Sequence, residues 1–127
     1  MKSPEGSFRS DVQMICARDG RYRPDAYSFV AEALDVTVKD VRAANPDHDR
    51  HVTARELLEG IRTYALDEFG PMAYTVFAEW GLHETMDFGE IVYNLIDIGR
   101  FGKTEEDKKE DFRDVFSFDE AFLAPYR

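Results

Sequence analysis

The chain has almost no cysteine and no long apolar segment, and both absences restrict where it can work. Cys16 is the single cysteine among 127 residues, which excludes an internal disulfide and is typical of a reducing compartment. No apolar run approaches the roughly 20 residues of a membrane-spanning helix. The first residues, MKSPEGSFRSD, lack the apolar core of a secretory signal. We therefore expect a cytoplasmic protein that has no membrane partner.

Basic residues are scarce in the second half of the chain. The formal net charge is −10. Residues 1–63 carry 10 Lys and Arg against 11 Asp and Glu, whereas residues 64–127 carry 6 against 15. A surface built from the second half is thus strongly negative and repels polyanions such as nucleic acids.

The chain also lacks the short motifs that carry common catalytic chemistry. It contains no GxxxxGK[ST] phosphate loop, no GxSxG nucleophile turn and no HExxH zinc motif. The GKT at 102–104 lacks the first glycine of a phosphate loop and follows a predicted helix instead of a strand. The sequence therefore predicts no catalytic residue, no metal site and no cofactor, and we expect a protein that is not an enzyme.

The length and composition of the chain predict one globular domain over residues 1–127. Apolar residues make up 43% of it, including ten Phe and six Tyr. Apolar residues at helical spacing, together with caps and Gly/Pro stops, predict mostly helices. These are a short helix opened by a capping box at Ser10, a helix from Pro24 to about Ala44, one opened by a capping box at 53–56 and ending at Phe69, one at about 71–80, and one capped by Thr85 or Asp87 and ending at Gly99.

The region after the last of these helices predicts a small amount of β-structure. Residues 101–103 and 115–118 are short apolar runs of a length suited to paired strands. Their connection, 104–114, is longer than a tight hairpin and forms either a wing or a helical turn. A helix followed by a hairpin is typical of a winged-helix domain. The predicted fold class is therefore mainly α, of the α+β type: a helical bundle with a winged-helix-like C-terminal half carrying a short β-hairpin. Within it we expect N-terminal helices at about 8–45, helices plus hairpin at about 52–118, and a tail at 119–127 that packs Phe122 back onto the domain.

Three segments carry a resemblance to a known family. They are ICARDGRYRPDAYSFVAEALDVT, HVTARELLEGIRTYALDEFGPMAYTVFAEWG and TMDFGEIVYNLIDIGRFGKTEEDKKEDFRDVFSFDEAF. Together they resemble a family of small uncharacterised bacterial proteins associated with Verrucomicrobia and Planctomycetes. The resemblance implies a bacterial, cytoplasmic protein and brings no activity, cofactor or catalytic residue. The segment AANPDHDR departs from the family pattern.

The charge of the 84–99 region argues against duplex DNA as a partner. A DNA-reading helix needs Lys or Arg to contact phosphates and bases, and this region has four acidic residues and no basic one. The 103–114 connection adds six acidic against four basic residues. The leading hypothesis is a non-catalytic interaction or regulatory module that binds an unidentified protein partner through this acidic, winged-helix-like surface. Its candidate residues are Glu84, Asp87, Glu90, Asn94 and Asp97.

One basic and aromatic cluster supports an alternative function. Arg18, Arg21, Tyr22 and Arg23 stand just before the helix that begins at Pro24. Guanidinium groups near a helix N-terminus are typical of an anion site, and an arginine with a tyrosine suits a phosphate or a stacked base. The alternative hypothesis is an RNA- or nucleotide-associated protein. The competing interpretation is that these arginines pair with nearby or C-terminal acids and only stiffen the domain.

A weaker alternative is calcium binding at residues 45–56. Oxygen-bearing side chains stand at loop positions 1, 3, 5, 9 and 12, with predicted helices on both sides, which is the spacing of an EF-hand. However, Arg50 occupies the position where a glycine makes the sharp turn. Glu56 is equally explained as part of a capping box with Thr53. The loop is therefore a degenerate EF-hand at best.

Overall fold

The computed structural model describes residues 4–46 and 52–127. This part of the chain forms five α-helices: α1 (Pro4–Arg18), α2 (Pro24–Ala44), α3 (Ala54–Phe69), α4 (Ala73–Glu79) and α5 (Thr85–Asp97). Shorter turns complete it: the 3₁₀ turns η1 (Gly70–Met72), η2 (Lys109–Phe112) and η4 (Ala124–Tyr126), and the π-helical turn η3 (Asp119–Leu123). The predicted mainly helical character is confirmed.

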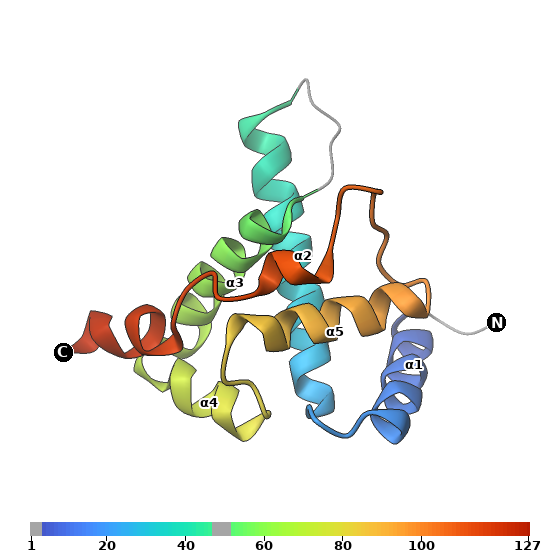
Figure 1. Cartoon of the computed structure of the whole chain (residues 1–127), viewed down its shortest axis with the longest axis horizontal. Coiled ribbons are helices and arrows are strands. Elements are labelled where there is room, and N and C mark those ends of the chain that lie inside the picture. The colour runs from blue at the N-terminus through green and yellow to red at the C-terminus, as the bar shows by residue number, and fades with distance from the viewer. Residues whose placement is uncertain (1–3, 47–51) are drawn as a thin grey trace.

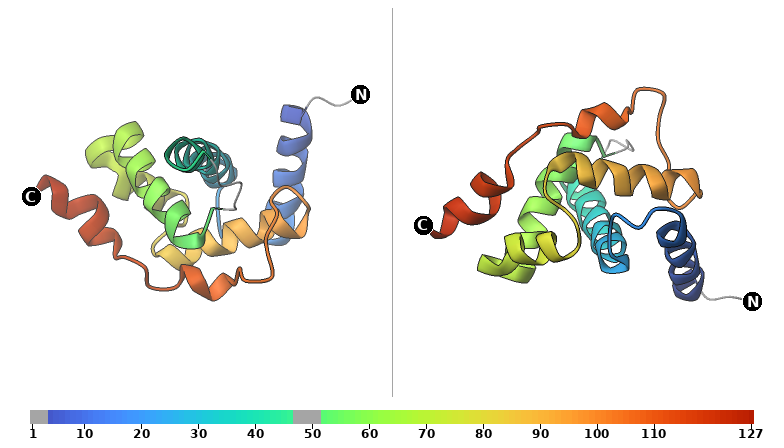
Figure 2. Two further views of the ribbon diagram at one scale, coloured as in Figure 1. Left: turned by 90° about the horizontal axis from the view of Figure 1, so that it is seen from above. Right: turned by 60° about the horizontal axis from the view of Figure 1, so that its bottom comes forward.

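Helix α5 lies across the pair formed by α2 and α3 (Figure 1). α1 packs on α2 at one end of the molecule, and η3 and η4 lie at the opposite end (Figures 1 and 2). Between these ends, the segment that follows α5 runs back over it, so that η2 contacts both α5 and α3. This segment forms the outer wall of the pocket described below.

Local sequence signals set the ends of two helices. Thr53 and Glu56 form the predicted capping box before α3: the Glu56 amide donates to Thr53 Oγ1 at 3.1 Å, and the Thr53 amide donates to Glu56 Oε1 at 3.0 Å. Pro24 takes the first position of α2, where its missing N–H costs nothing. α2 then continues to Ala44, as predicted, without a break at its β-branched residues 36–38.

The predicted start of α1 is wrong. The helix begins at Pro4, so Ser10, the expected cap, lies within the helix. Its apolar face is as predicted, because Val12 and Ile15 are buried and Cys16 is partly buried against them. The burial of one face, and not the serine, therefore decides the position of this helix.

The start of α5 also differs from the prediction. Its N-cap is Glu84, not Thr85 or Asp87. The Asp87 carboxylate accepts hydrogen bonds from the amides of His83 at 2.8 Å and Glu84 at 3.2 Å, so it satisfies the chain just before the helix. Thr85 is fully buried and serves another purpose, described below.

The predicted β-hairpin, and with it the winged-helix-like half, is wrong. Residues 4–46 and 52–127 contain no β-strand. After α5 the chain turns at Gly99, whose φ of +79° suits a glycine, and the Arg100 amide donates back to the Leu95 carbonyl at 2.9 Å. The connection at 104–114 holds the turn η2, which was the helical alternative to a wing.

The residues of the second predicted strand are bonded and packed in a different way. The Val115 amide donates to the Thr85 hydroxyl at 3.2 Å instead of to a neighbouring strand. Phe118 is buried and its ring lies 5.7 Å from that of Phe88. A short run of bends that buries apolar side chains has the same apolar pattern as a short strand, which is why the pattern misled.

Phe77 of α4 lies at the centre of an aromatic core. Its ring contacts Phe29 of α2 at 5.4 Å and Phe88 of α5 at 5.4 Å between centroids. Phe118 lies at 5.8 Å and Phe122 at 5.2 Å. The predicted packing of Phe122 onto the domain is confirmed, since this side chain is fully buried. The core thus joins α2, α4 and α5 to the C-terminal segment.

Gly89 permits the closest approach in this arrangement. It lies on the buried side of α5, directly under Phe112 of η2. A Cβ added at Gly89 would lie 2.7 Å from Phe112 Cβ and 2.8 Å from its Cγ, closer than van der Waals contact allows. A glycine at this position therefore lets η2 rest directly on α5.

Replacing Gly89 with Ala is expected to lower the free energy of unfolding by about 1–2 kcal/mol. The new methyl group displaces Phe112, and this overpacking outweighs the roughly 1 kcal/mol that alanine gains over glycine within a helix. Urea denaturation measures the change. Gly102→Ala is the matched control, because its added Cβ meets nothing within 4 Å. A Gly89→Ala protein as stable as the wild type would contradict the close contact.

Candidate functional site

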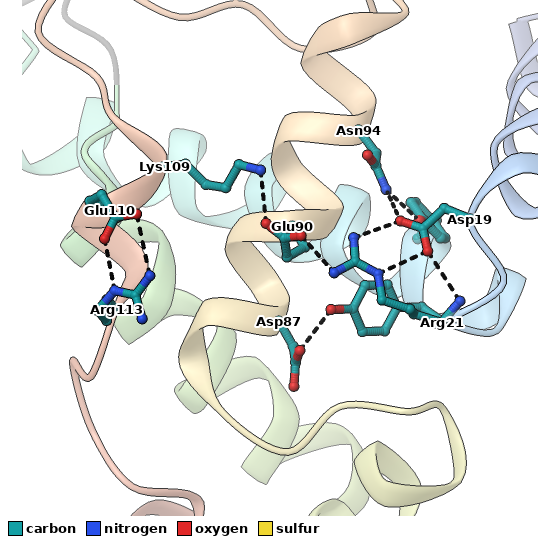
Figure 3. A network of polar contacts seen from close by, with 10 residues as sticks. Asp19, Arg21, Asp87, Glu90, Asn94, Lys109, Glu110 and Arg113 are labelled. Carbon is teal, nitrogen blue, oxygen red and sulfur yellow. Dashed lines mark hydrogen bonds and ion pairs between the residues drawn. The ribbon is translucent and has the colours of Figure 1, made fainter.

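A network of charged side chains ties the loop between α1 and α2 to α5 (Figure 3). Arg21 lies between two carboxylates: its guanidinium nitrogens are 2.7 Å from Asp19 Oδ2 and 2.7 Å from Glu90 Oε2. Glu90 also pairs with Lys109 of η2 at 2.8 Å. The network therefore joins three segments that are far apart in the sequence.

The network shifts the titration of its two carboxylates. The hydrogen bond from Arg21 is the main cause that lowers the pKa of Asp19. The hydrogen bond from Lys109, followed by that from Arg21, lowers the pKa of Glu90. Both carboxylates are therefore more readily ionised in the folded chain, and their ion pairs stabilise it at neutral pH.

A second set of hydrogen bonds joins the same loop to α5. Tyr22 is buried, and its hydroxyl donates to Asp87 Oδ1 at 2.7 Å. Burial, followed by this hydrogen bond, raises the pKa of Tyr22. The Asn94 side chain donates to Asp19 Oδ2 at 3.1 Å and to the Tyr27 hydroxyl at 3.0 Å. These contacts leave the buried polar groups of the interface satisfied.

The arginine cluster therefore divides into two parts. Arg21 is engaged by Asp19 and Glu90, and Tyr22 is buried against Asp87. This agrees with the interpretation that the cluster stiffens the domain. Arg18 and Arg23 are exposed. Anion or RNA binding at this cluster stays a prediction, now limited to the side chains of these two arginines.

The proposed acidic surface divides in the same way. Asp87, Glu90 and Asn94 make the intramolecular contacts just described, whereas Glu84 and Asp97 are exposed. Protein binding by these five residues stays a prediction. The structure places three of them where they stabilise the fold.

Part of the loop in the calcium hypothesis, residues 47–51, lies outside the described residues. At the described end of the loop, Glu56 accepts the hydrogen bond of the capping box. Within 4–46 and 52–127, no group of three or more His, Cys, Asp or Glu side chains is arranged to hold a metal ion. Measured against the length and apolar character that crossing a bilayer needs, none of the helices in these ranges qualifies.

A pocket of about 310 Å³ opens between α2, the start of α3, α5 and the 101–112 segment. About half of its wall is apolar, and the apolar side chains come from all four segments: Leu34 and Val38, Leu57, Val92 and Ile96, and Phe101 and Phe112. Its volume lies at the lower end of the range for ligand-binding pockets in proteins. No residue of the arginine cluster or of the proposed acidic surface lines it, whereas Thr53 of the calcium loop does.

The rim of this pocket is charged. Lys103 and Lys108 of the 101–112 segment and Arg42 of α2 line it together with Asp107 and Asp111, which belong to the same segment as the lysines. The lining thus has one positive charge in excess, although the whole chain has a net charge of −10. The 101–112 segment as a whole has five acidic and three basic residues, so this excess belongs to the lining and not to the segment.

One wall of the pocket contains a polar group with unmet hydrogen-bonding capacity. The hydroxyl of Tyr93 is buried and has no hydrogen-bond partner among the described residues. Burial, followed by the charges of Asp107 and Asp111, raises the pKa of Tyr93. Lys103 Nζ lies 5.8 Å from the centre of the tyrosine ring. Buried hydroxyls without a partner are uncommon and call for an explanation.

Thr85 holds the outer wall of the pocket in place. Its buried hydroxyl donates to the Phe112 carbonyl at 2.6 Å and accepts from the Val115 amide at 3.2 Å. These two bonds fix the chain on either side of residue 113 against the start of α5. Together with the Gly89 contact, they determine where Phe112 closes the pocket.

Sequence reasoning missed this pocket because its parts are far apart in the chain. The sequence predicts 101–103 as a strand and 104–114 as a wing or a helical turn, and neither prediction places these residues beside α2 and α5. One signal was available: Lys103 and Lys108 lie in the stretch 100–113, which holds five of the six basic residues of the second half. That both lysines line the same pocket depends on tertiary contacts, which the periodicity of the sequence does not specify.

A search of protein-family models, curated proteins and solved structures finds no match for this chain. The resemblance to the Verrucomicrobia- and Planctomycetes-associated family therefore stays a prediction.

Replacing Arg21 with Gln is expected to lower the free energy of unfolding by no more than about 1 kcal/mol at pH 7, since its side chain is half exposed and screened. Because the pKa values of Asp19 and Glu90 are lowered in the folded state, their stabilisation is present above the ordinary carboxyl range. It is lost as pH falls through the folded values. The stability difference between wild type and variant should thus shrink below about pH 4.

Urea denaturation at a series of pH values between 7 and 2 measures this dependence. Arg18→Gln is the control, because it removes an exposed arginine of the same cluster. A difference for Arg21→Gln that stays constant across the whole pH range would contradict the proposed coupling.

Replacing Thr85 with Val is expected to cost about 1–3 kcal/mol of unfolding free energy. The methyl group of similar shape leaves the Phe112 carbonyl and the Val115 amide without their buried partner. Thr85→Ser keeps the hydroxyl and should retain most of this stability. Thermal and urea denaturation of the two variants measure it. Equal losses would show that the hydroxyl is not the stabilising group.

Proposed function

We propose that this protein is a non-catalytic interaction module that binds a protein partner by receiving a bulky apolar side chain of that partner in the pocket beside α5. The observation that carries this proposal is the pocket itself: about 310 Å³, open to solvent and walled by apolar side chains from four segments. An open apolar pocket is the feature that binding anchors occupy at protein interfaces.

The size of the pocket suits a single anchor residue. An aromatic side chain buries about 150–250 Å² of surface, worth about 4–6 kcal/mol at 25 cal/mol per Å². A contribution of this size is sufficient for a hot spot, although losses of translational and side-chain freedom offset part of it. One anchor in this pocket, with rim contacts around it, would therefore support a specific but reversible complex.

We propose the pocket, and not the acidic face of α5, as the surface that binds the partner. Asp87, Glu90 and Asn94 are occupied by intramolecular contacts, so binding a partner there would have to break them. The pocket requires no such loss. We further propose that the binding takes place in the cytoplasm, which the single thiol, Cys16, supports.

Photo-crosslinking from the pocket rim tests this proposal. The purified protein carries p-benzoylphenylalanine in place of Gly102, a rim position with open space around it. It is irradiated in lysate of the source cells and its adducts are identified by mass. We expect one discrete protein adduct, which disappears when Val38→Trp fills the pocket.

The matched control carries the same group in place of Val36, an exposed residue of α2 that does not line the pocket. A thermal melt confirms that the Val38→Trp protein is folded. No adduct from position 102, or an adduct that persists after the pocket is filled, would contradict the proposed function.

A further inference from the structure

The charges at the rim indicate which kind of residue lies next to the apolar anchor in the sequence of the partner. Three cationic side chains line the pocket, two of them on the 101–112 segment, against two anionic ones. At physiological ionic strength, charges farther than about 8 Å are largely screened. An occupant of the pocket is therefore affected mainly by the charged side chains that line it, and less by the net charge of −10.

The two acidic groups of the rim are already engaged by the backbone. Asp107 Oδ2 accepts from the Thr104 amide at 2.8 Å, and Asp111 Oδ2 accepts from the Lys108 amide at 3.2 Å. These bonds shape the 101–112 segment and partly satisfy its carboxylates. The ammonium groups of Lys103 and Lys108 donate only, so they cannot accept from backbone amides as these carboxylates do.

Tyr93 is another donor in the lining, and its hydroxyl has no acceptor among the described residues. Its hydroxyl is buried, faces no hydrogen-bond partner among the described residues, and belongs to the lining of the pocket. The ammonium group of Lys103 lies over the Tyr93 ring, so the two side chains line the same side of the pocket. An oxygen acceptor that enters beside Lys103 would pair with its ammonium group.

We propose that the pocket recognises a partner segment in which a bulky apolar residue stands next to an aspartate or glutamate. The apolar side chain enters between Val38, Val92 and Ile96, and the carboxylate pairs with Lys103 and Lys108 at the rim. This inference rests on the proposed function, because it specifies the partner for the same pocket. It adds that a neutral apolar segment binds more weakly than an acidic one.

Two matched peptides test the inference. Both are acetylated and amidated, with the sequences Gly-Asp-Phe-Asp-Gly and Gly-Asn-Phe-Asn-Gly, and they differ only in charge. Each is titrated into the ¹⁵N-labelled protein at 150 mM salt, and amide shifts of Gly102 and Lys103 give the dissociation constant. The acidic peptide is expected to bind about 5- to 10-fold more tightly, as two partly exposed ion pairs allow.

The double substitution Lys103→Gln and Lys108→Gln should remove this preference and leave the affinity for the neutral peptide unchanged within about twofold. Lys39→Gln is the control for net charge, since Lys39 lies outside the pocket with a side chain that is 76% exposed. It should leave the preference intact.

The outcomes separate this inference from the proposed function. Equal binding of both peptides at the pocket, lost on Val38→Trp, overturns the acidic preference and supports the apolar anchor. A preference that survives the double lysine substitution also overturns the inference. Absence of binding by either peptide counts against both proposals.

Discussion

The contact of Phe112 with Gly89 is the constraint on which the rest of the structure depends. Without a side chain at Gly89, η2 rests directly on α5 and reaches α3 behind it. That position brings Lys109 to Glu90 and closes the outer wall of the pocket with Phe112. The buried hydroxyl of Thr85 holds the same segment through its backbone. The absence of a side chain at Gly89 thus determines both how the C-terminal segment packs on α5 and what shape the pocket has.

The acidic character of the second half has a structural consequence as well as a functional one. Glu90 lies on α5, where it meets Arg21 from the N-terminal loop and Lys109 from η2. The nearly neutral first half thereby supplies the cation that the acidic helix lacks. Partly exposed ion pairs of this kind contribute modestly to stability, and their main effect here is to fix the relative position of three segments. The same contacts occupy side chains that the sequence alone offers to a partner.

The sequence predicts where the helices lie better than it predicts how they pack together. The capping box of Thr53 and Glu56 and the Pro24 start are local, so the helices they begin could be read from a few residues. The hairpin prediction failed because residues 115–118 bury apolar side chains such as Phe118 from bends and the start of η3, and not from a strand. The pocket could not be predicted, since it depends on a contact between residues 89 and 112 that no short-range pattern encodes. The polar side chains of α5 were identified as noteworthy, but their partners are set by tertiary structure.

The central claim is that the pocket beside α5 holds an apolar anchor. Intermolecular nuclear Overhauser effects between the phenylalanine ring of the acidic peptide and the methyl groups of the protein test it most directly. The account predicts cross-peaks to the methyl groups of Val38, Val92 and Ile96, which line the pocket. Cross-peaks to Val12 or Val36 instead, both of which lie outside it, would contradict the account.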